Sequence, residues 1–412
     1  MPRETSRELD GQAAAPVLNA SGYTEEYWQS RRSLVAHDRR KVLFVVNDAG
    51  FFRSHRLRLA QEARRRGYEA VVACGESTGE NALEEFGIRY RVFHLSRSGL
   101  NPLRDLKTFF ALLRIYRDEA PDIVHHVTIK PVIYGTLASR FARVPAVVNA
   151  IPGMGFVFTQ RGFTARVVRG LVNLLYRIAL SHENMRFIFQ NREDLQSFVE
   201  NTVIPEQLTY LIRGSGIDLN DFPCTAEPAE PVAFVLVARM LSDKGIREFV
   251  AAARSVRLLQ PTWRFQLVGG VDRGNPSSLT EPELKGWHAE GVVEWLGHRS
   301  DVRACLGRSH VVCLPSYREG LPKSLLEASG IGRPMIASNV PGCREVVRDG
   351  ITGLLVEPRD STALADAMLR LGQDPQLRRR LGKAARERAE GLYSIDDVVR
   401  DTFLIYDELL PA

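Results

Sequence analysis

The stretch Leu314-Pro-Ser-Tyr-Arg-Glu-Gly-Leu-Pro-Lys-Ser-Leu-Leu-Glu-Ala328 decides the fold prediction. An apolar run of strand length passes through a turn at Gly320 into a helical segment that has Pro322 in its first turn, where proline is favoured. The unpaired amides and the dipole of such a helix start favour an anion such as a phosphate. A strand, a turn and a helix in this order form the repeating unit of a parallel α/β sheet.

The same alternation of strand and helix extends in both directions from this stretch. Short continuous apolar runs suit strands that are buried on both faces of a parallel sheet. Amphipathic stretches separate them, including one helix expected over residues 54–66. The expected strands are Val42–Val46, Ala70–Cys74, Tyr90–Leu95, Ile123–Val127, Ala146–Ala150, Phe187–Gln190, Leu208–Ile212, Ala233–Ala238, Phe265–Val268, Val292–Leu296, Val311–Leu314, Met335–Ala337 and Leu354–Val356.

A loop and a Pro-rich stretch near residues 213–231 interrupt the alternation and have the composition of a linker. A chain of 412 residues is long enough for two domains. We therefore predict an α/β protein with two doubly wound, Rossmann-like domains facing a central cleft, where ligands of such sheets bind. The expected parts are an extension (1–40, with a short helix around 23–34), a first domain (41–215), a second domain (216–390) and a C-terminal helix that could return to the first domain (391–412).

The formal net charge of +6 is unevenly distributed along the chain. Residues 41–180 hold 21 Lys and Arg against 11 Asp and Glu, whereas the rest of the chain is net acidic. Between Asp122 and Glu183 lie seven basic side chains and no acidic one. This predicts a positive face on the first domain, and on charge alone nucleic acid, an anionic membrane and a phosphorylated substrate all fit it.

Cysteine usage and apolar runs indicate the compartment. The five scattered cysteines form no C-x-x-C pair, which is typical of free thiols in a reducing compartment. The first 40 residues have no apolar core of signal-peptide type, and no uncharged apolar run reaches the roughly 18 residues of a membrane span. We expect a cytoplasmic protein. The Arg-rich segment 164–182 suits either a helix lying on anionic lipid or a core-packed helix with solvated arginines.

Two cations and two carboxylates lie near strand ends of the second domain. Arg239 and Lys244, on one strand-to-helix loop, can clamp a diphosphate and offset the charge of a leaving group. Glu319 and Glu327 can accept hydrogen bonds from hydroxyls. The alternatives are solvated cations, a helix-start charge and an exposed helical residue. Because all four residues follow strands of one domain, a common site is favoured.

Further candidates lie on other strand-end loops, although each glycine could serve only as a turn residue. The pair His125-His126 ends a strand, and since neighbouring strand residues face opposite sides, at most one of them looks into the cleft. A role in the core is the alternative for both. The remaining candidates are Gly269, Gly297, His298 and Arg299 in the second domain and Gly50, His55, Lys130, Gly153 and Gly155 in the first.

Several common motifs are missing from the sequence. Neither Gly153-Met-Gly155 nor Gly214-Ser-Gly216 completes G-x-G-x-x-G, and the G-x-x-x-x-G-K-[ST] phosphate loop is absent, which disfavours a dinucleotide. No Asp-x-Asp occurs, and no His, Cys and carboxylate cluster has metal-ligand spacing, so we expect neither a metal nor a cofactor. A G-x-S-x-G nucleophile elbow is absent too.

The motifs of the second domain resemble those of a known family. They are Arg239…Lys244-Gly245, the E-x7-E element from Glu319 to Glu327, the preceding Pro315-Ser316 and the later Gly342…Glu345…Gly350…Gly353. This set is similar to the retaining glycosyltransferases of the glycogen-synthase-like superfamily, glycosyltransferase family 4, which have a GT-B fold. The resemblance covers about residues 41–390.

A subgroup is indicated as well. Five segments resemble the bacterial enzymes that extend polyprenyl-diphosphate-linked sugars, such as N-acetylgalactosaminyltransferases. These segments are Phe51–Arg56, Lys130-Pro131, Tyr134-Gly135, Gly153–Phe156 and Leu267–Pro276. The chain departs from the family at Asp48-Ala-Gly50, where many relatives have paired glycines, and at Thr128-Ile-Lys130, where several have a histidine near the sugar. His55 or His126 could take that place.

The resemblance implies roles for the candidate residues. Arg239 and Lys244 would bind the donor diphosphate and stabilise it as the leaving group, Glu319 would contact the donor sugar, and Glu327 would contact the ribose hydroxyls. The other donor contacts would come from the backbone of Gly320, Leu321 and Pro322, from Gly269, from Gly297, His298 and Arg299 beside the base, and from Gly50 beside the phosphates. The acceptor side would include His55, His126, Lys130, Gly153 and Gly155.

The implied activity is transfer of a sugar, in particular N-acetylhexosamine, from a UDP-sugar to a polyprenyl-diphosphate-linked saccharide in cell-surface glycan assembly. We expect no metal and no nucleic acid, and peripheral contact with an anionic membrane on the cytoplasmic face of the inner membrane. Two alternatives stay open: a nucleotide-sugar epimerase of the same fold, which needs no acceptor, and a family 4 transferase with a different acceptor. A non-enzymatic binder of nucleic acid or membrane would leave the cations and carboxylates of the second domain unexplained.

Overall fold

The computed structural model describes residues 39–75, 80–95, 102–153, 182–201 and 204–411. Lys41–Ala412 form one compact unit, and Met1–Arg40 are grouped apart from it. The helix expected around residues 23–34, residues 164–181 of the Arg-rich segment and Gly155 lie outside the described residues.

The first sheet has seven parallel strands in the order β3-β2-β1-β4-β5-β6-β7. The order runs outward in one direction from β1 and in the other from β4, which is the doubly wound arrangement expected from the sequence. The strands are β1 (Lys41–Val46), β2 (Glu69–Gly75), β3 (Arg89–Phe93), β4 (Ile123–Val127), β5 (Ala146–Ile151), β6 (Met185–Phe189) and β7 (Thr209–Leu211).

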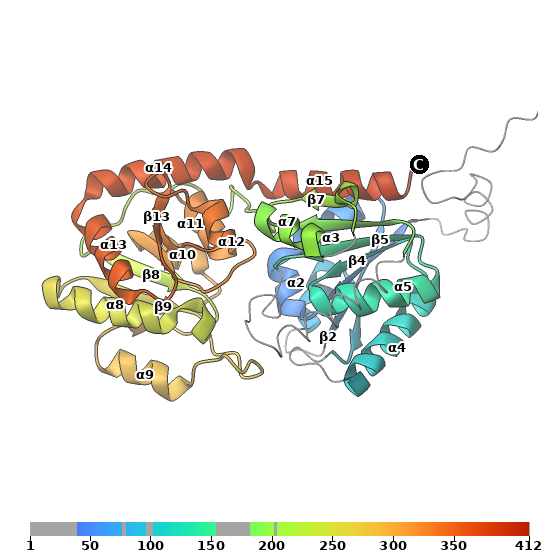
Figure 1. Ribbon diagram of the computed structural model, residues 1–412, viewed down its shortest axis with the longest axis horizontal. Coiled ribbons are helices and arrows are strands. Elements are labelled where there is room, and N and C mark those ends of the chain that lie inside the picture. The colour runs from blue at the N-terminus through green and yellow to red at the C-terminus, as the bar shows by residue number, and fades with distance from the viewer. Residues whose placement is uncertain (1–38, 76–79, 96–101, 154–181, 202–203, 412) are drawn as a thin grey trace, which may run out of the picture. The chain divides into compact units, whose positions relative to one another are not determined.

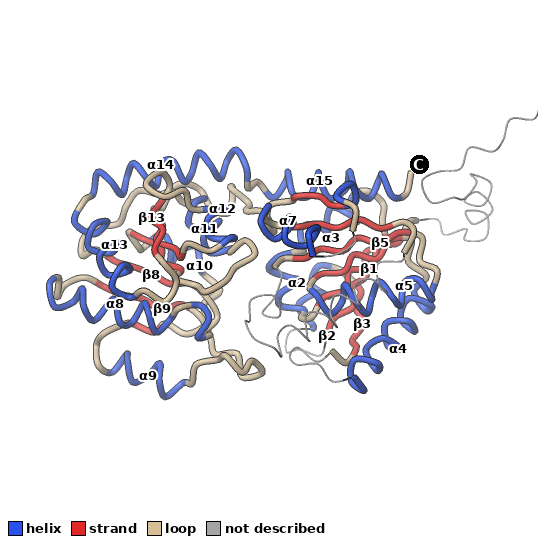
Figure 2. Tube along the Cα trace, viewed as in Figure 1, coloured by secondary structure: helices blue, strands red, loops and turns tan. Residues whose placement is uncertain are grey.

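Helices cover both faces of this sheet, as Figures 1 and 2 show. Residues 42, 44 and 46 of β1 pack with α2, α3 and α15, whereas residues 43 and 45 pack with α4 and α5, as the two-residue period of a strand requires. The helices are α2 (Ala49–His55), α3 (Leu57–Arg65), α4 (Pro102–Glu119), the π-helical turn η2 (Pro131–Gly135), α5 (Thr136–Ala142), α7 (Arg192–Asn201) and α15 (Ile395–Leu409), with the 3-10 turns η1 (Glu80–Phe86) and η4 (Glu206–Leu208).

The prediction of a single helix over residues 54–66 is wrong. Asp48 caps a helix that begins earlier, because its Oδ1 accepts a hydrogen bond from the amide of Phe51 at 2.8 Å. This helix, α2, ends at His55, and α3 begins at Leu57. Between them Arg56 leaves helical geometry, with φ at −134°, and is buried.

The second sheet has six parallel strands in the order β10-β9-β8-β11-β12-β13, which repeats the arrangement of the first. Its strands are β8 (Ala233–Val237), β9 (Arg264–Val268), β10 (Glu294–Trp295), β11 (Val311–Leu314), β12 (Met335–Ser338) and β13 (Gly353–Val356). Its helices are α8 (Ile246–Leu259), α9 (Glu281–Ala289), α10 (Val302–Gly307), α11 (Lys323–Gly330), α12 (Pro341–Val346), α13 (Ser361–Gln373) and α14 (Pro375–Leu392), with the 3-10 turn η5 (Ser242–Lys244).

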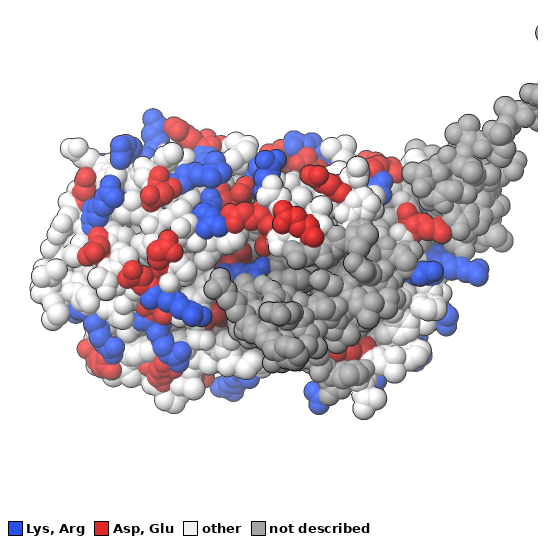
Figure 3. All heavy atoms as spheres, in the orientation of Figure 1, with Lys and Arg blue, Asp and Glu red and all other residues white. Residues whose placement is uncertain are grey.

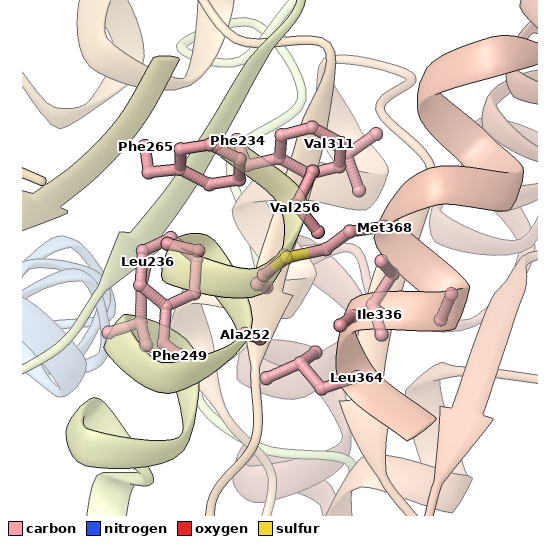
Figure 4. Close-up of a cluster of buried hydrophobic side chains, with 14 of the residues drawn as sticks. Phe234, Leu236, Phe249, Ala252, Val256, Phe265, Val311, Ile336, Leu364 and Met368 are labelled. Atoms are coloured by element: carbon pink, nitrogen blue, oxygen red, sulfur yellow. The ribbon is translucent and has the colours of Figure 1, made fainter. Parts of the chain in front are cut away.

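Apolar packing holds the helices on this sheet. On one face Phe234, Phe265 and Ile336 of the strands meet Phe249 of α8 and Met368 of α13 (Figure 4). The rings of Phe234 and Phe265 stack with centroids 5.4 Å apart. On the other face α10, α11, α12 and α14 pack against the strands. Both faces are therefore buried, which explains why these strands are continuous apolar runs in the sequence.

The end of the chain packs on the first sheet. Val398, Phe403 and Tyr406 of α15 are buried in the same apolar cluster as β1, α2 and α3. Two backbone hydrogen bonds tie the start of this helix to Ile217: the amide of Ile217 donates to Tyr393 at 2.8 Å, and that of Ile395 donates to Ile217 at 3.0 Å.

Each of the expected strands has a counterpart in the two sheets, so the predicted class of two parallel-sheet α/β domains is confirmed. The shortest, β10, spans only Glu294–Trp295 of the five residues expected there. Gly342 of the family motif lies inside α12.

Candidate functional site

The strand order brings two candidate loops together. β8 and β11 are neighbours at the point where the order of the second sheet reverses, and ligands of such sheets bind beyond the carboxyl ends of these strands. Arg239 follows β8 by two residues, and Glu319 follows β11 by five. The cation loop and the carboxylate turn predicted from the sequence therefore lie side by side.

Lys244 and Glu319 form the centre of this arrangement. Nζ of Lys244 lies 2.6 Å from Oε1 of Glu319, and the hydroxyl of Ser316 donates to the same oxygen at 2.7 Å. The side chains of Lys244 and Glu319 are 20% and 10% exposed, so solvent screens this ion pair only partly. Gly245 makes the approach of the two loops feasible, because a Cβ there would lie 2.1 Å from the carbonyl oxygen of Pro315.

Arg239 lies in a more open position. Its guanidinium donates to Oδ2 of Asp272 at 2.7 Å, but the arginine side chain is 62% exposed. An ion pair this exposed contributes little to stability. An incoming diphosphate could therefore replace Asp272 as the partner of Arg239 at low cost.

The turn at Gly320 leads into α11, with Pro322 as the N-cap residue rather than in the first turn. A Cβ on Gly320 would lie 1.3 Å from the carbonyl oxygen of Pro152, so only glycine fits. Gly342 allows the turn to pass equally closely on its other side, because a Cβ there would lie 2.3 Å from the carbonyl oxygen of Gly320. The first amides of α11 have no intrahelical acceptor and are available to an anion.

A buried polar network, which sequence reasoning missed, holds this turn. The Asn191 amide group, beyond the end of β6, donates to the Gly320 carbonyl oxygen at 2.8 Å and to Oδ2 of Asp194 at 2.9 Å. Asp194 in turn pairs with Arg318 at 3.3 Å. Asn191 and Asp194 are 1% and 5% exposed. Residues of the first domain therefore position the carboxylate turn of the second. In the sequence, the position of Asn191 just after an expected strand could have indicated this role.

Glu327 lies one turn into α11 and is 7% exposed. Burial raises the pKa of its carboxyl group, and Lys323, at 3.4 Å, opposes that shift. Lys323 also donates to the carbonyl oxygen of Ser54 at 2.8 Å. Glu327 is therefore a nearly buried carboxylate with a neighbouring cation, rather than the exposed helical residue that was the alternative.

The loops after β9 and β10 are joined by their glycines. The amide of Gly269 donates to the Gly297 carbonyl oxygen at 2.8 Å, and Nε1 of Trp295 donates to the Gly269 carbonyl oxygen at 2.9 Å. A Cβ on Gly269 would lie 1.7 Å from the carbonyl oxygen of Ala238. His298 is exposed, and Arg299 forms a two-pronged ion pair with Asp301 at 2.8 and 2.7 Å.

The first-domain candidates divide into groups. Gly50 is exposed in the first turn of α2, and Gly153 faces the turn of the second domain, because a Cβ there would lie 3.4 Å from Cα of Gly320. His55 stacks on Phe51 with ring centroids 4.2 Å apart. Burial lowers the pKa of His55 to about 3, and the cations Lys323, Arg56 and Arg239 contribute to this shift. Lys130 pairs with Asp105 of α4 at 3.0 Å.

The histidine pair lies in the core, so His126 does not lie on the acceptor side as the resemblance implied. It is fully buried, with Nε2 2.9 Å from the Tyr116 hydroxyl and Nδ1 2.8 Å from Oδ1 of Asn149. His125 faces the opposite side of the strand, where Nδ1 lies 2.7 Å from the hydroxyl of Tyr406. The expectation that the two rings face opposite sides holds, but neither reaches the surface.

Charge on the described surface is mixed. Figure 3 shows Lys and Arg interspersed with Asp and Glu on the face that it draws. Within the described ranges, no three His, Cys, Asp or Glu side chains gather as metal ligands would. No helix of the same ranges has the length and apolar character needed to cross a membrane. The basic residues Arg161, Arg166, Arg169 and Arg177, on which the expected positive face partly rests, lie outside the described residues.

Two family models match the chain. The model of "Glycosyl transferase 4-like" proteins matches residues 41–191, and that of "Glycosyl transferases group 1" matches residues 220–388. Together they cover strands β1 to β6 of the first sheet, the whole second sheet and the candidate loops after β8 and β11.

Similar proteins and structures span most of the chain. An N,N'-diacetylbacillosaminyl-diphospho-undecaprenol alpha-1,3-N-acetylgalactosaminyltransferase of Campylobacter jejuni is 29% identical over 90% of this chain and 99% of that protein. The N-acetyl-alpha-D-glucosaminyl L-malate synthase of Bacillus anthracis is 35% identical over 70% of each chain. The crystal structure of Anabaena HepE in complex with UDP and glucose superposes with a TM-score of 0.73, at 20% identity, over 90% of this chain and 100% of that one.

Proposed function

Because the chain belongs to the family 4 glycosyltransferases and has their GT-B fold, we propose that it is a retaining glycosyltransferase that moves a sugar from a UDP-sugar to a lipid-linked saccharide. Its bacterial relatives include transferases that act on undecaprenyl-diphospho-sugars, which supports a role in glycan biosynthesis. The transferred sugar is an N-acetylhexosamine, as in the N-acetylgalactosaminyltransferase relative.

The single observation that carries this proposal is the convergence of Lys244, Arg239 and Glu319 beside the amide end of α11. Two cations at one strand edge suit a diphosphate, and both can strengthen their contacts as the leaving phosphate gains charge. Lys244 and Ser316 both bind one oxygen of the Glu319 carboxylate, so the other oxygen can accept a hydrogen bond from a hydroxyl of the donor sugar. Glu327, further along α11, contacts the ribose hydroxyls.

The proposed chemistry proceeds on one face of the donor sugar. The bond between the anomeric carbon and the phosphate oxygen breaks while the acceptor hydroxyl oxygen bonds to the same carbon from the same side. The proton of that hydroxyl passes to the departing phosphate oxygen. Lys244 and Arg239 stabilise the departing diphosphate electrostatically, so the reaction needs no resident metal.

The acceptor is a polyprenyl-diphosphate-linked saccharide. The relative that is matched along 99% of its length uses such an acceptor by its name, whereas the relative named for L-malate is matched along 70%. The first domain (41–215) provides the acceptor side, through His55, Lys130, Gly153 and Gly155, and the second (216–390) the donor side. A lipid-linked acceptor also accounts for the proposed peripheral contact with an anionic membrane at the cytoplasmic face.

The experiment that tests this function incubates the purified protein with UDP-N-acetylhexosamines and a short-chain polyprenyl-diphosphate sugar. We expect product from the unchanged protein and little from Arg239→Ala or Glu319→Ala. Full activity in either variant would remove the assignment. Conversion of the donor without acceptor would indicate the epimerase alternative, and product only with a water-soluble acceptor would indicate a different acceptor class.

A further inference from the structure

Helix α4 packs on the first sheet with one face and presents a mixed apolar and basic face on its other side. Residues at intervals of three and four along the inner face are buried: Asp105, Thr108, Leu112, Tyr116 and Glu119. Residues at the same intervals along the outer face are all exposed: Leu103, Lys107, Phe110, Arg114 and Arg117. The outer face of α4 therefore differs from the uniformly polar surface of an ordinary amphipathic helix.

Large apolar side chains lie on this outer surface. Leu103, Leu106 and Phe110 of α4 and Phe141 of α5 are between 51% and 75% exposed. The two helices lie side by side (Figure 1), and the ring centroid of Phe109 is 5.2 Å from that of Phe110 and 5.8 Å from that of Phe141. A cluster of exposed apolar side chains indicates a contact surface.

The exposed charge around these side chains is positive. The exposed cations of α4, of α5 and of the residue that ends α5 are Arg104, Lys107, Arg114, Arg117, Arg140 and Arg143. Among the carboxylates of α4, Asp105 and Glu119 are buried, and only Asp118 is exposed, 3.7 Å from Arg114. Helix α5 has no acidic residue. The surface therefore suits a partner that is both apolar and anionic.

We propose that this surface docks on an anionic lipid bilayer. We define the α4–α5 surface by Leu103, Leu106, Lys107, Phe110, Arg114, Arg117, Arg140 and Phe141. Its apolar side chains enter the boundary between headgroups and acyl chains, while its long basic side chains extend their charged ends to the lipid phosphates. A second copy of the chain fits less well, because the same positive face would meet itself across a two-fold axis.

The α4–α5 surface lies beside the proposed acceptor side. Asp105, on the inner face of α4, accepts a hydrogen bond at 3.0 Å from the ammonium group of Lys130, which is an acceptor-side candidate. The outer face of α4 is about one helix diameter, roughly 10 Å, from this pair. Docking brings the lipid headgroups, where a lipid-linked diphosphate lies, close to Lys130. The inference rests on the membrane contact of the proposed function and assigns that contact to named residues.

Vesicle sedimentation with the full chain tests the docking without donor or acceptor. We expect the protein to bind vesicles of phosphatidylglycerol and phosphatidylcholine at low salt. Binding should be roughly tenfold weaker at high salt and to phosphatidylcholine alone, because the basic side chains contribute through screened charge. Absence of binding to the anionic vesicles at low salt would overturn the proposal.

An apolar variant locates the contact. Phe110→Ser together with Phe141→Ser should lower the partition coefficient by roughly 100-fold, because two aromatic side chains no longer enter the bilayer. Leu258→Ser together with Leu259→Ser, which changes two exposed apolar side chains at the end of α8, is the matched control and should bind as the unchanged protein does. Equal losses in the two variants would contradict the assignment.

A charge variant tests the basic part of the surface. Arg114→Gln together with Arg117→Gln should weaken vesicle binding by roughly 30-fold. Arg379→Gln together with Arg380→Gln makes the same change of net charge on exposed residues of α14 and should leave binding unchanged. If both pairs weaken binding equally, net charge and not this surface directs the contact, and the proposal is wrong.

Hydrogen exchange of the unchanged protein decides the matter if a variant does not fold. With anionic vesicles, amides of α4 and α5 should exchange more slowly, whereas those of α13 and α14 should keep their rates. Protection confined to residues 164–182, or a change of oligomeric state without vesicle binding, would refute the docking surface. Because no substrate is present, a protein that binds vesicles in this way but transfers no sugar would contradict the proposed function and not this inference.

Discussion

The ammonium group of Lys244 lies 2.6 Å from Oε1 of Glu319, and the two residues come from neighbouring strand-end loops 75 positions apart in the chain. Ser316 donates to the same oxygen at 2.7 Å. Among the described residues no hydrogen bond reaches the second oxygen of Glu319. Because a carboxylate can accept on both oxygens, Glu319 can keep its position and still bind a sugar hydroxyl.

Lys244→Met should lower kcat by roughly 100- to 1000-fold, the usual cost of losing one group that stabilises developing charge. KM for the donor should change less, because the contact strengthens as the phosphate leaves. Steady-state kinetics with donor and lipid-linked acceptor measure both. Lys285→Met, which removes an exposed lysine of α9, is the matched control and should leave the kinetics unchanged. An unchanged kcat in Lys244→Met would contradict the role.

Gly320→Ala should abolish most activity, whereas Gly286→Ala, in α9, should not. The added methyl group at Gly320 would lie 1.3 Å from the carbonyl oxygen of Pro152, so the turn must move. At Gly286 the added methyl group would meet no atom within 4 Å. A displacement of about 1 Å near reacting groups costs roughly 100-fold in rate. Equal activities of the two variants would contradict the proposed function of this turn.

Much of the fold could be predicted because buried parallel strands are continuous apolar runs. Val42–Val46 and Val311–Leu314 are visible in this way, and each lies in the expected sheet. Other features depend on tertiary contacts. Arg56 ends α2 where the sequence continues in a helical pattern, and its side chain enters the core. Arg378 is likewise buried, bonded to the carbonyl oxygens of Leu371 and Gly372 at 2.9 and 2.8 Å, although its sequence context is that of a surface helix.

Asn191→Leu should raise KM for the donor and lower stability by about 1–3 kcal/mol, because the Gly320 carbonyl oxygen and Asp194 lose a buried donor. Asn191 acts on the turn and not on the substrate, so the effect should appear mainly in KM. Asn191→Gln, which keeps the amide group, should recover part of the loss. Donor titrations and urea unfolding separate the two effects. A stability loss with unchanged KM would reduce Asn191 to a purely structural residue.

The candidate site could be predicted in part, because functional residues of parallel sheets lie on the loops that follow the strands. Lys244 and Glu319 both follow central strands, and the strand order brings them together. Nothing in the sequence indicates that Asn191 meets Gly320 or that Asp194 meets Arg318, because these contacts depend on the packing of two separate sheets. His126 shows the opposite error: it ends a strand as a site residue would, but its neighbours Tyr116 and Asn149 enclose it.

The buried state of His126 predicts loss of stability in acid. Burial lowers the pKa of His126 to about 3, against 6.5 in an exposed ring. Below pH 6.5 the unfolded chain therefore binds a proton that the folded protein does not, and the free energy of unfolding falls by about 1.4 kcal/mol per pH unit for this residue. Urea unfolding between pH 7 and pH 4.5 should show a shallower decline in His126→Gln. Identical slopes would mean that His126 does not titrate in this way.

The anomeric configuration of the product tests the central claim most directly. The purified protein is given an α-linked UDP-N-acetylhexosamine and a polyprenyl-diphosphate sugar, and proton NMR follows the new glycosidic linkage from the first turnover. Retaining transfer at the site of Lys244, Arg239 and Glu319 predicts an α-linkage, and the signal should be lost in Glu319→Ala. A β-linked product, or an α-linked product that persists unchanged in Glu319→Ala, would contradict the account.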